Sequence, residues 1–290
     1  MHDISIYCIL CPSYHGATLL SLVLGNHSRV LSLGDTVAAS PSQRCGCGKL
    51  VGECEFWRSV RARWGGVTNQ EFIPARPKIL PWPRLNQAAS LCSAVIAFRA
   101  GAVIRFDPLA RAFEAQLDVC RELTDFDVLI DGYKSLSRYA ALKAAGFPIR
   151  GAIHLLRDPR SFVASSKVRS ISVAHAAREW SRIHRAITRI TDLMGERVFQ
   201  VRYNELCAAP KEQLANIQSW MHLHTEPILR PLDADRHWVG NKSMRHFTGE
   251  IRPRDDWQTR LTKAEVSCVE ALTASEALRF GYDLSRETGK

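Results

Sequence analysis

Residues 5–25 read SIYCILCPSYHGATLLSLVLG, and this stretch decides which fold the chain can adopt. The apolar residues 5–10 are typical of a buried strand, Pro12 and Gly16 indicate a turn, and small and hydroxyl side chains from Ala17 onward open a helix. A strand, turn and helix in this order direct backbone N–H groups and the positive end of the helix dipole toward one point. We therefore expect the N–H groups of residues 14–19 to bind an anion at the carboxyl end of this strand.

Strand and helix signals alternate along the rest of the chain. Further short runs of apolar or β-branched residues lie at 127–131, 152–156 and 197–201, and each is followed by a pattern of helical period. This alternation predicts an α/β fold of three layers, P-loop-like, with a central parallel sheet flanked by helices. We expect a single domain over residues 1–290, with an irregular Cys- and Pro-rich insertion at about 40–84 and a helical acceptor-side segment at about 85–125.

Composition narrows the class of partner. The 290 residues include 39 Lys and Arg against 29 Asp and Glu, a net charge of +10, which favours an anionic partner. The hydrophobic content of 46% supports a sizeable core and excludes a disordered chain. The apolar segment 4–10 is short and has no Lys or Arg before it, so we expect neither a secretory signal nor a transmembrane segment, and a cytoplasmic location with membrane association left open.

Nine cysteines are present, three of them close together in RCGCGKLVGEC as Cys45, Cys47 and Cys54. An odd number in a chain of this size, without a signal peptide, does not indicate a disulfide framework. Three thiols with C-x-C spacing could belong to a zinc site, but structural zinc needs a fourth ligand and none follows nearby. We therefore favour a buried or locally cross-linked loop over zinc, and expect no metal.

The loop after the first strand lacks the residues of a nucleoside triphosphatase. The phosphate loop of those enzymes ends in Gly-Lys followed by Ser or Thr, whereas this chain has Cys11 at the first glycine position and Ala17 before Thr18. Without the lysine, hydrolysis of ATP or GTP is disfavoured. The loop therefore suits a different anion.

Five stretches together carry a resemblance to a known family. YHGATLLSLVLGNHSRVLSLGD resembles the 5'-phosphosulfate loop of sulfotransferases that use 3'-phosphoadenosine 5'-phosphosulfate (PAPS). CGCGKLVGECEFW is similar to a Cys-rich stretch of bacterial members, HLLRDPRSFVASS to the 3'-phosphate motif, VRYNELCAAP to the adenine-side element, and GNKSMRHFTGEIRPRDDW to the C-terminal loop. These five stretches cover most of the chain in the family's order, and they resemble the bacterial sulfotransferases of the tyrosylprotein and carbohydrate branch. Tyr14 and His15 depart from it, because the family commonly has a basic residue and Ser there.

The resemblance implies a set of donor-binding residues. The loop would bind the phosphosulfate, a strand-end arginine and a helix serine the 3'-phosphate, a tyrosine the adenine, and the C-terminal loop the 3'-phosphate again. In this sequence they are Tyr14, His15, Gly16, Ala17, Thr18, Leu19, Arg157, Ser165, Tyr203, Asn241 and Arg245. Position alone also favours Arg157, which follows the strand 152–156 and could grip a phosphate as a bidentate fork. The alternatives are a surface ion pair with Asp158 for Arg157 and a core tyrosine for Tyr203.

Three residues are candidates for catalysis. Asp35, in SLGDT, resembles the acidic residue that accepts the acceptor's proton in related sulfotransferases, and His15 is the rival base. Lys134, in DGYK, is similar to the lysine that stabilises charge on the bridging oxygen, and it could also neutralise the phosphosulfate. The alternatives are a turn-capping role for Asp35 and simple surface exposure for Lys134.

The sequence hypothesis is therefore in-line transfer of a sulfuryl group from PAPS to an acceptor hydroxyl, on a carbohydrate, a lipid-linked compound, a peptide or a small natural product. We expect an anionic nucleotide donor and no required metal. A divergent P-loop kinase, and a basic protein that binds nucleic acid or another polyanion without catalysis, are the alternatives. No nucleic-acid motif is present, so we expect no nucleic-acid partner.

Overall fold

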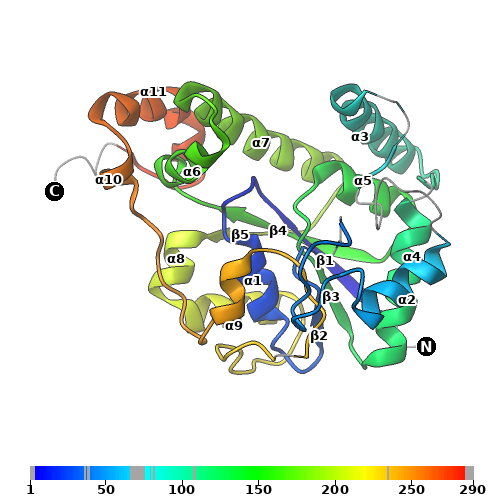
Figure 1. The fold of residues 1–290 in the computed structure, drawn as a ribbon. Coiled ribbons are helices and arrows are strands. Elements are labelled where there is room, and N and C mark those ends of the chain that lie inside the picture. Colours follow the sequence, from blue (N-terminus) through cyan, green and yellow to red (C-terminus); the bar gives the residue numbers. More distant parts are fainter. Residues whose placement is uncertain are drawn as a thin grey trace.

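The computed structural model describes residues 4–35, 37, 40–65, 76–78, 80, 82–106, 109–233 and 235–284. Its centre is a five-stranded parallel sheet in the order β2-β3-β1-β4-β5 (Figure 1). The strands are β1 (Ser5–Leu10), β2 (Val30–Ser32), β3 (Val128–Asp131), β4 (Ile149–Leu156) and β5 (Val198–Arg202). The predicted α/β fold with a flanked parallel sheet is confirmed, and all four predicted strands are present.

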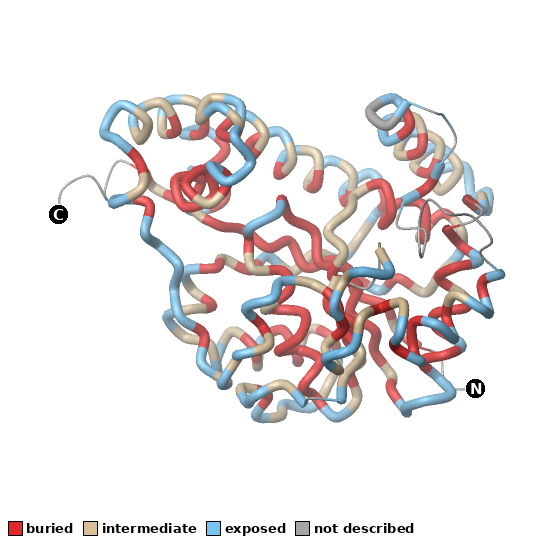
Figure 2. Tube along the Cα trace, viewed as in Figure 1, coloured by how far each residue is buried: buried red, intermediate tan, exposed pale blue. Residues whose placement is uncertain are grey.

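The central strand shows why the fold has three layers. Successive side chains of β1 point to opposite faces of the sheet. Ile6, Cys8 and Leu10 pack into one apolar cluster with α2 (Glu55–Trp64), α4 (Leu109–Leu123) and α5 (Leu136–Ala144). Tyr7 and Ile9 pack into a second cluster with α1 (Ala17–Leu24) and α9 (Pro210–Trp220). Burial on both faces explains the continuous apolar run, and Figure 2 shows the strands as buried along most of their length.

The helices follow the predicted pattern and cover both faces. One face carries α1 (Ala17–Leu24), α8 (Tyr203–Ala208) and α9 (Pro210–Trp220); the other carries α5 (Leu136–Ala144), with α6 (Pro159–Ser166) and α7 (Val173–Leu193) beyond it (Figure 1). Local chemistry sets the helix starts. Asp158 accepts hydrogen bonds from the N–H groups of Arg160 and Ser161 while Pro159 occupies the first helical turn, which is the usual beginning of a helix.

The segments between β2 and β3 are largely helical. They comprise α2 (Glu55–Trp64), α3 (Pro83–Arg99) and α4 (Leu109–Leu123). The expected insertion at about 40–84 thus contains one regular helix, and its residues 66–75 lie outside the described residues. The expected helical segment at 85–125 corresponds to α3 and α4, which pack on α5 and α2 respectively.

The chain ends in 3-10 helix η2 (Lys242–His246), α10 (Trp257–Arg260) and α11 (Lys263–Arg279), and a further 3-10 turn, η1 (Lys167–Arg169), follows α6. The last helix packs against α6 and α7 in a third apolar cluster that contains Trp180 and Phe280. In the part of the chain that the structure describes, none of the helices combines the length and apolar character that a membrane span requires.

Candidate functional site

The candidate residues follow the carboxyl ends of all five strands. The loop 11–16 follows β1, Asp35 follows β2, Lys134 follows β3, Arg157 follows β4 and Tyr203 follows β5. Because the strands are parallel, their carboxyl ends lie at one edge of the sheet, where ligands bind in open α/β folds. The topology therefore brings together residues that are up to 192 positions apart, from Cys11 to Tyr203.

The loop after β1 is shaped to direct its backbone inward. Tyr14 and Gly16 both have positive φ angles, 64° and 90°, and Gly16 caps the beginning of α1. A Cβ atom at Gly16 would lie 3.0 Å from the Tyr203 ring, so only glycine combines this backbone conformation with that close contact. Ala17, Thr18 and Leu19 form the first turn of α1, whose N–H groups have no earlier helical partner. This is a suitable cradle for an anion.

Arg157 is the hub of the site. Its Nη1 donates to the Tyr14 carbonyl at 2.6 Å and to Ser165 Oγ at 3.3 Å, and its Nη2 donates to the Arg254 carbonyl. The guanidinium also lies 5.0 Å from the centroid of the Tyr203 ring. Asp158, the alternative partner, pairs with Arg160 instead. The structure thus joins Arg157, Ser165 and Tyr203 to the loop, as expected for one binding site.

Burial gives this hub its electrostatic character. Arg157 is 6% exposed, and burial lowers the pKa of its guanidinium, partly offset by nearby acidic groups. Its Nε is buried and has no hydrogen-bond partner among the described residues. An unpaired buried donor on a cation favours an anion strongly. Burial also raises the pKa of Tyr203 to about 12, so its hydroxyl stays protonated and donates to the Arg252 carbonyl.

The two principal catalytic candidates touch each other. Lys134 Nζ donates to Asp35 Oδ1 at 2.6 Å, and Thr18 Oγ1 donates to the same oxygen at 3.3 Å. The side chains of Lys134 and Asp35 are 19% and 27% exposed, so both remain accessible from solvent. A carboxylate and an ammonium group therefore lie beside the first turn of α1, which is the position that the hypothesis requires of them.

A buried ion pair at the end of β3 holds the turn that carries Lys134. Asp131, the last residue of β3, accepts from Arg138 Nε at 2.8 Å and from the backbone N–H of Tyr133 at 3.0 Å. The turn that follows holds Lys134 at a φ of 70°, an unusual conformation for a side-chain-bearing residue. Asp131 thus positions the turn that carries the lysine.

His15 does not have the surroundings of a base. It is 0% exposed, and its Nε2 lies 3.0 Å from Nε2 of His184, whose Nδ1 lies 2.8 Å from Nε2 of His154. We call these three residues the histidine row. Burial lowers the pKa of His15 to about 3 and that of His154 to about 4, so both are neutral at pH 7. A protonated His15 would supply part of the positive charge that the loop lacks, but burial lowers its pKa and so disfavours that form, which leaves Lys134 as the candidate for this charge.

The C-terminal segment packs against the first turn of α1 through Gly240, whereas the two candidates from the sequence, Asn241 and Arg245, make other contacts. Gly240 packs so closely on Thr18 that a Cβ atom would lie 2.5 Å from Thr18 Cγ2. Asn241 caps η2 by accepting from the Ser243 N–H. Arg245 donates to the Cys45 carbonyl at 2.7 Å and faces the Trp238 ring, so it contacts the cysteine-bearing loop, residues 45–54, and the C-terminal segment rather than Arg157.

Several contributors carried no signal in the sequence. The Val239 carbonyl accepts from the Asp35 N–H at 2.8 Å, and the Val239 N–H donates to Leu33, so the C-terminal segment fixes the loop that bears Asp35. His154 and His184 were equally unmarked. Backbone partners and buried imidazoles have no motif, and only the fold shows what they touch.

Comparison with known proteins agrees with this geometry. A family profile described as the sulfotransferase family matches residues 15–227, and the chain therefore belongs to that family. No curated protein sequence matched the chain.

Solved structures show the same fold. The sulfotransferase domain of the olefin synthase from Synechococcus PCC 7002 superposes with a TM-score of 0.58 at 20% identity, over 97% of this chain and 96% of that one. The sulfotransferase domain from the curacin biosynthetic pathway gives 0.50 at 15% identity, over 96% and 99% of the two chains. At these identities the likeness establishes the fold alone.

Proposed function

We propose that the protein transfers a sulfuryl group from PAPS to a hydroxyl group of an acceptor. The observation that carries this proposal is the arrangement around the glycine-containing loop that follows β1. Arg157 lies on one side of this loop, and the Asp35–Lys134 pair lies on the other. PAPS is anionic at two points, its 3'-phosphate and its 5'-phosphosulfate. The chain has a cationic side chain for each of these two groups: Arg157 lies beside Tyr14, and Lys134 lies near Thr18.

The donor fits the groups that the chain leaves unsatisfied. The buried Nε of Arg157 lacks a partner among the described residues, and together with Ser165 Oγ it can bind the 3'-phosphate. Tyr203, packed against Gly16 and Arg157, lies where it can contact the adenosine. The N–H groups of residues 14–19 bind the 5'-phosphosulfate. Asn241 remains a candidate for closing the site, whereas the contacts of Arg245 favour a structural role.

The chemistry uses the Asp–Lys pair. As the acceptor oxygen forms a bond to sulfur, the bond between sulfur and the bridging 5'-phosphate oxygen breaks, and 3'-phosphoadenosine 5'-phosphate (PAP) is released. Asp35 takes the proton of the acceptor hydroxyl, while Lys134 and the loop N–H groups stabilise the charge that develops on the bridging oxygen. Asp35 is preferred to His15 as the base because it has solvent-accessible surface and His15 has none.

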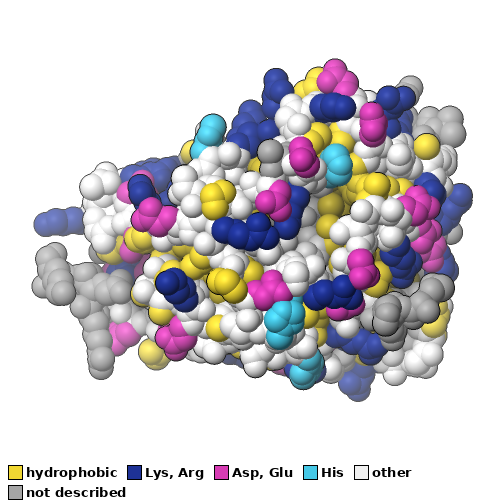
Figure 3. Space-filling view, turned by 90° about the horizontal axis from the view of Figure 1, so that it is seen from below, with side chains coloured by type: hydrophobic (Ala, Val, Ile, Leu, Met, Phe, Trp, Pro, Cys, Tyr) yellow, Lys and Arg dark blue, Asp and Glu magenta, His cyan; other side chains and the backbone are white. Residues whose placement is uncertain are grey.

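The two alternative functions lack comparable support. A kinase would need a lysine at the loop, where this chain has Ala17. On the face drawn in Figure 3, Lys and Arg are interspersed with Asp and Glu, so that face is not the uniformly basic surface expected of a protein that binds polyanions.

Calorimetric titration with PAP, 5'-AMP and Mg-ATP tests the donor, and incubation with PAPS and a panel of hydroxyl acceptors tests the reaction. We expect PAP to bind most tightly, and Asp35→Asn to lower the turnover of PAPS about 100-fold or more while PAP still binds, since a general base contributes about that much. Equal binding of Mg-ATP and PAP, or full turnover by Asp35→Asn, would contradict the proposal.

A further inference from the structure

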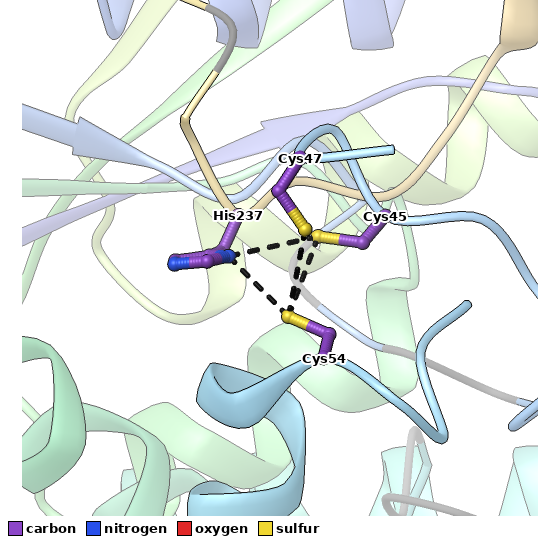
Figure 4. Close-up of side chains that lie close together, drawn as sticks. All are labelled: Cys45, Cys47, Cys54 and His237. Atoms are coloured by element: carbon purple, nitrogen blue, oxygen red, sulfur yellow. Dashed lines mark hydrogen bonds between the residues drawn. The ribbon is translucent and has the colours of Figure 1, made fainter. Parts of the chain in front are cut away.

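Four side chains with metal-ligand atoms meet at a point away from the Asp–Lys pair. Cys45, Cys47 and Cys54 come from the cysteine-bearing loop, residues 45–54, and His237 comes from the C-terminal segment (Figure 4). Their sulfur and nitrogen atoms all lie within 4.8 Å of one another. No fourth ligand lies near the three cysteines in the sequence, but the fold brings His237 to them. His237 lies 183 positions beyond Cys54, so no local motif could include it.

The distances agree with one particular geometry. Tetrahedral zinc, with bonds of about 2.3 Å to sulfur and about 2.0 Å to nitrogen, separates two sulfur ligands by about 3.8 Å and a sulfur from a nitrogen by about 3.5 Å. Cys54 Sγ lies 3.8 Å from both Cys47 Sγ and Cys45 Sγ, and His237 Nδ1 lies 3.3 Å and 3.8 Å from Cys54 Sγ and Cys45 Sγ. A disulfide would need sulfur atoms about 2.05 Å apart.

The backbone builds this arrangement independently of the side chains. The turn from Cys45 to Lys49 is closed by hydrogen bonds from the Gly48 N–H to the Cys45 carbonyl at 3.1 Å and from the Cys45 N–H to the Lys49 carbonyl at 3.0 Å. Cys54 is the N-cap of α2. Across the cluster, the His237 ring stacks on Phe56 with an interplanar angle of 2°, which fixes its orientation.

A second contact holds the two segments together. The Gly46 N–H donates to the Trp238 carbonyl at 2.7 Å, and a Cβ atom at Gly46 would lie 2.3 Å from the Trp238 ring. Cys45 and Cys54 are 0% exposed, and Cys47, Cys54 and His237 line a cavity of about 450 Å³ through which an ion can reach the cluster. The ligands are thus pre-arranged, and a route to them exists.

We propose that Cys45, Cys47, Cys54 and His237 bind one zinc ion. Three thiolates and an imidazole select zinc over magnesium or calcium, which prefer oxygen ligands. Four protein ligands complete the tetrahedron, so the site is structural and leaves no position for a reacting water. The ion joins the cysteine-bearing loop to the segment around Val239, whose carbonyl accepts from the Asp35 N–H. The proposed zinc binding does not depend on whether the protein transfers sulfuryl groups. Only the consequence of zinc binding for Asp35 rests on the proposed function.

Zinc content is measured on the full chain, purified without chelator, by elemental analysis, and cobalt is then substituted for zinc. We expect one zinc ion per chain, and a cobalt derivative with the visible bands of tetrahedral coordination and a thiolate charge-transfer band. Cys47→Ser and His237→Asn should each lower the metal content or shift the cobalt bands. Cys92→Ser, an exposed cysteine on α3, is the matched control and should change neither.

Absence of zinc together with an octahedral cobalt spectrum would overturn the proposal, as would a cross-link between two of these cysteines in a peptide map. The wild-type cobalt spectrum keeps the test valid even where a variant fails to fold. Because neither readout measures turnover, the zinc proposal can fail while PAP binding succeeds, and the reverse.

Discussion

Replacement of Arg157 is the most direct perturbation of the donor site. A guanidinium has five N–H donors, and three of them are used by Tyr14, Ser165 and Arg254. Two therefore remain for a ligand, one of them the unpartnered Nε. At about 1.5 kcal/mol or more for each charge-assisted hydrogen bond, the two contribute about 3 kcal/mol, or about 100-fold in affinity.

The assay compares two nucleotides that differ only by the 3'-phosphate. Calorimetry of the wild type should show PAP binding about 100-fold more tightly than 5'-AMP, and Arg157→Ala should remove most of that preference. Arg157→Lys should give an intermediate preference, because it keeps the charge but loses the planar fork. Arg178→Ala, an exposed arginine on α7, is the control and should leave the preference unchanged.

One result would refute this reasoning. If Arg157→Ala retains the wild-type ratio of PAP to 5'-AMP affinity, the 3'-phosphate does not bind at the hub, whatever the absolute affinities. Weaker binding of both nucleotides at an unchanged ratio would also count against it, since that pattern indicates a disturbed loop rather than a lost phosphate contact.

Two further predictions concern the loop and the protein's stability. Gly16→Ala should destabilise the fold by about 1 kcal/mol or more, because alanine is disfavoured at a φ of 90° and its Cβ atom would press on the Tyr203 ring. The same substitution should weaken PAP binding. Unchanged thermal unfolding and unchanged PAP affinity would contradict this prediction. The histidine row should make stability depend on pH: His15 and His154 have folded-state pKa values of about 3 and about 4, below the unfolded value of about 6.5. The unfolded chain therefore gains protons first as the pH falls, so stability is complete above about pH 6.5 and decreases below it by about 3 kcal/mol per pH unit for the two residues. Urea unfolding between pH 7.5 and 5.5 measures this, and an equal free energy of unfolding at both values would refute it.

Local sequence was sufficient for the framework of the fold. Runs such as IYCIL are apolar without interruption, a pattern typical of a short strand covered on both faces. The strand β2 was missed because three residues, Val30–Ser32, are too few to show a period. The helix α2 was missed because Cys, Gly and Pro around it obscured an amphipathic segment of ten residues.

Position relative to a strand end was also enough to nominate Arg157 and Lys134, since parallel strands bring their carboxyl ends to one edge whatever lies between them. Asp35 was nominated by the family resemblance instead, because the strand before it was missed. The direction and the burial of a side chain are set by its neighbours in space, so the sequence could not show that His15 is buried or that Arg245 contacts the Cys45 carbonyl. For His15 those neighbours include His184, which belongs to a distant helix.

The sequence by itself determined the alternation of strands and helices, the glycine-containing loop and the sulfotransferase family, because each is written in contiguous residues. Only the tertiary structure decided that His15 is buried and that Asp35 pairs with Lys134. It alone brought His237 to the three cysteines. Such contacts join residues far apart in the chain, and their distances, burial and charge arise only when the sheet and its helices pack.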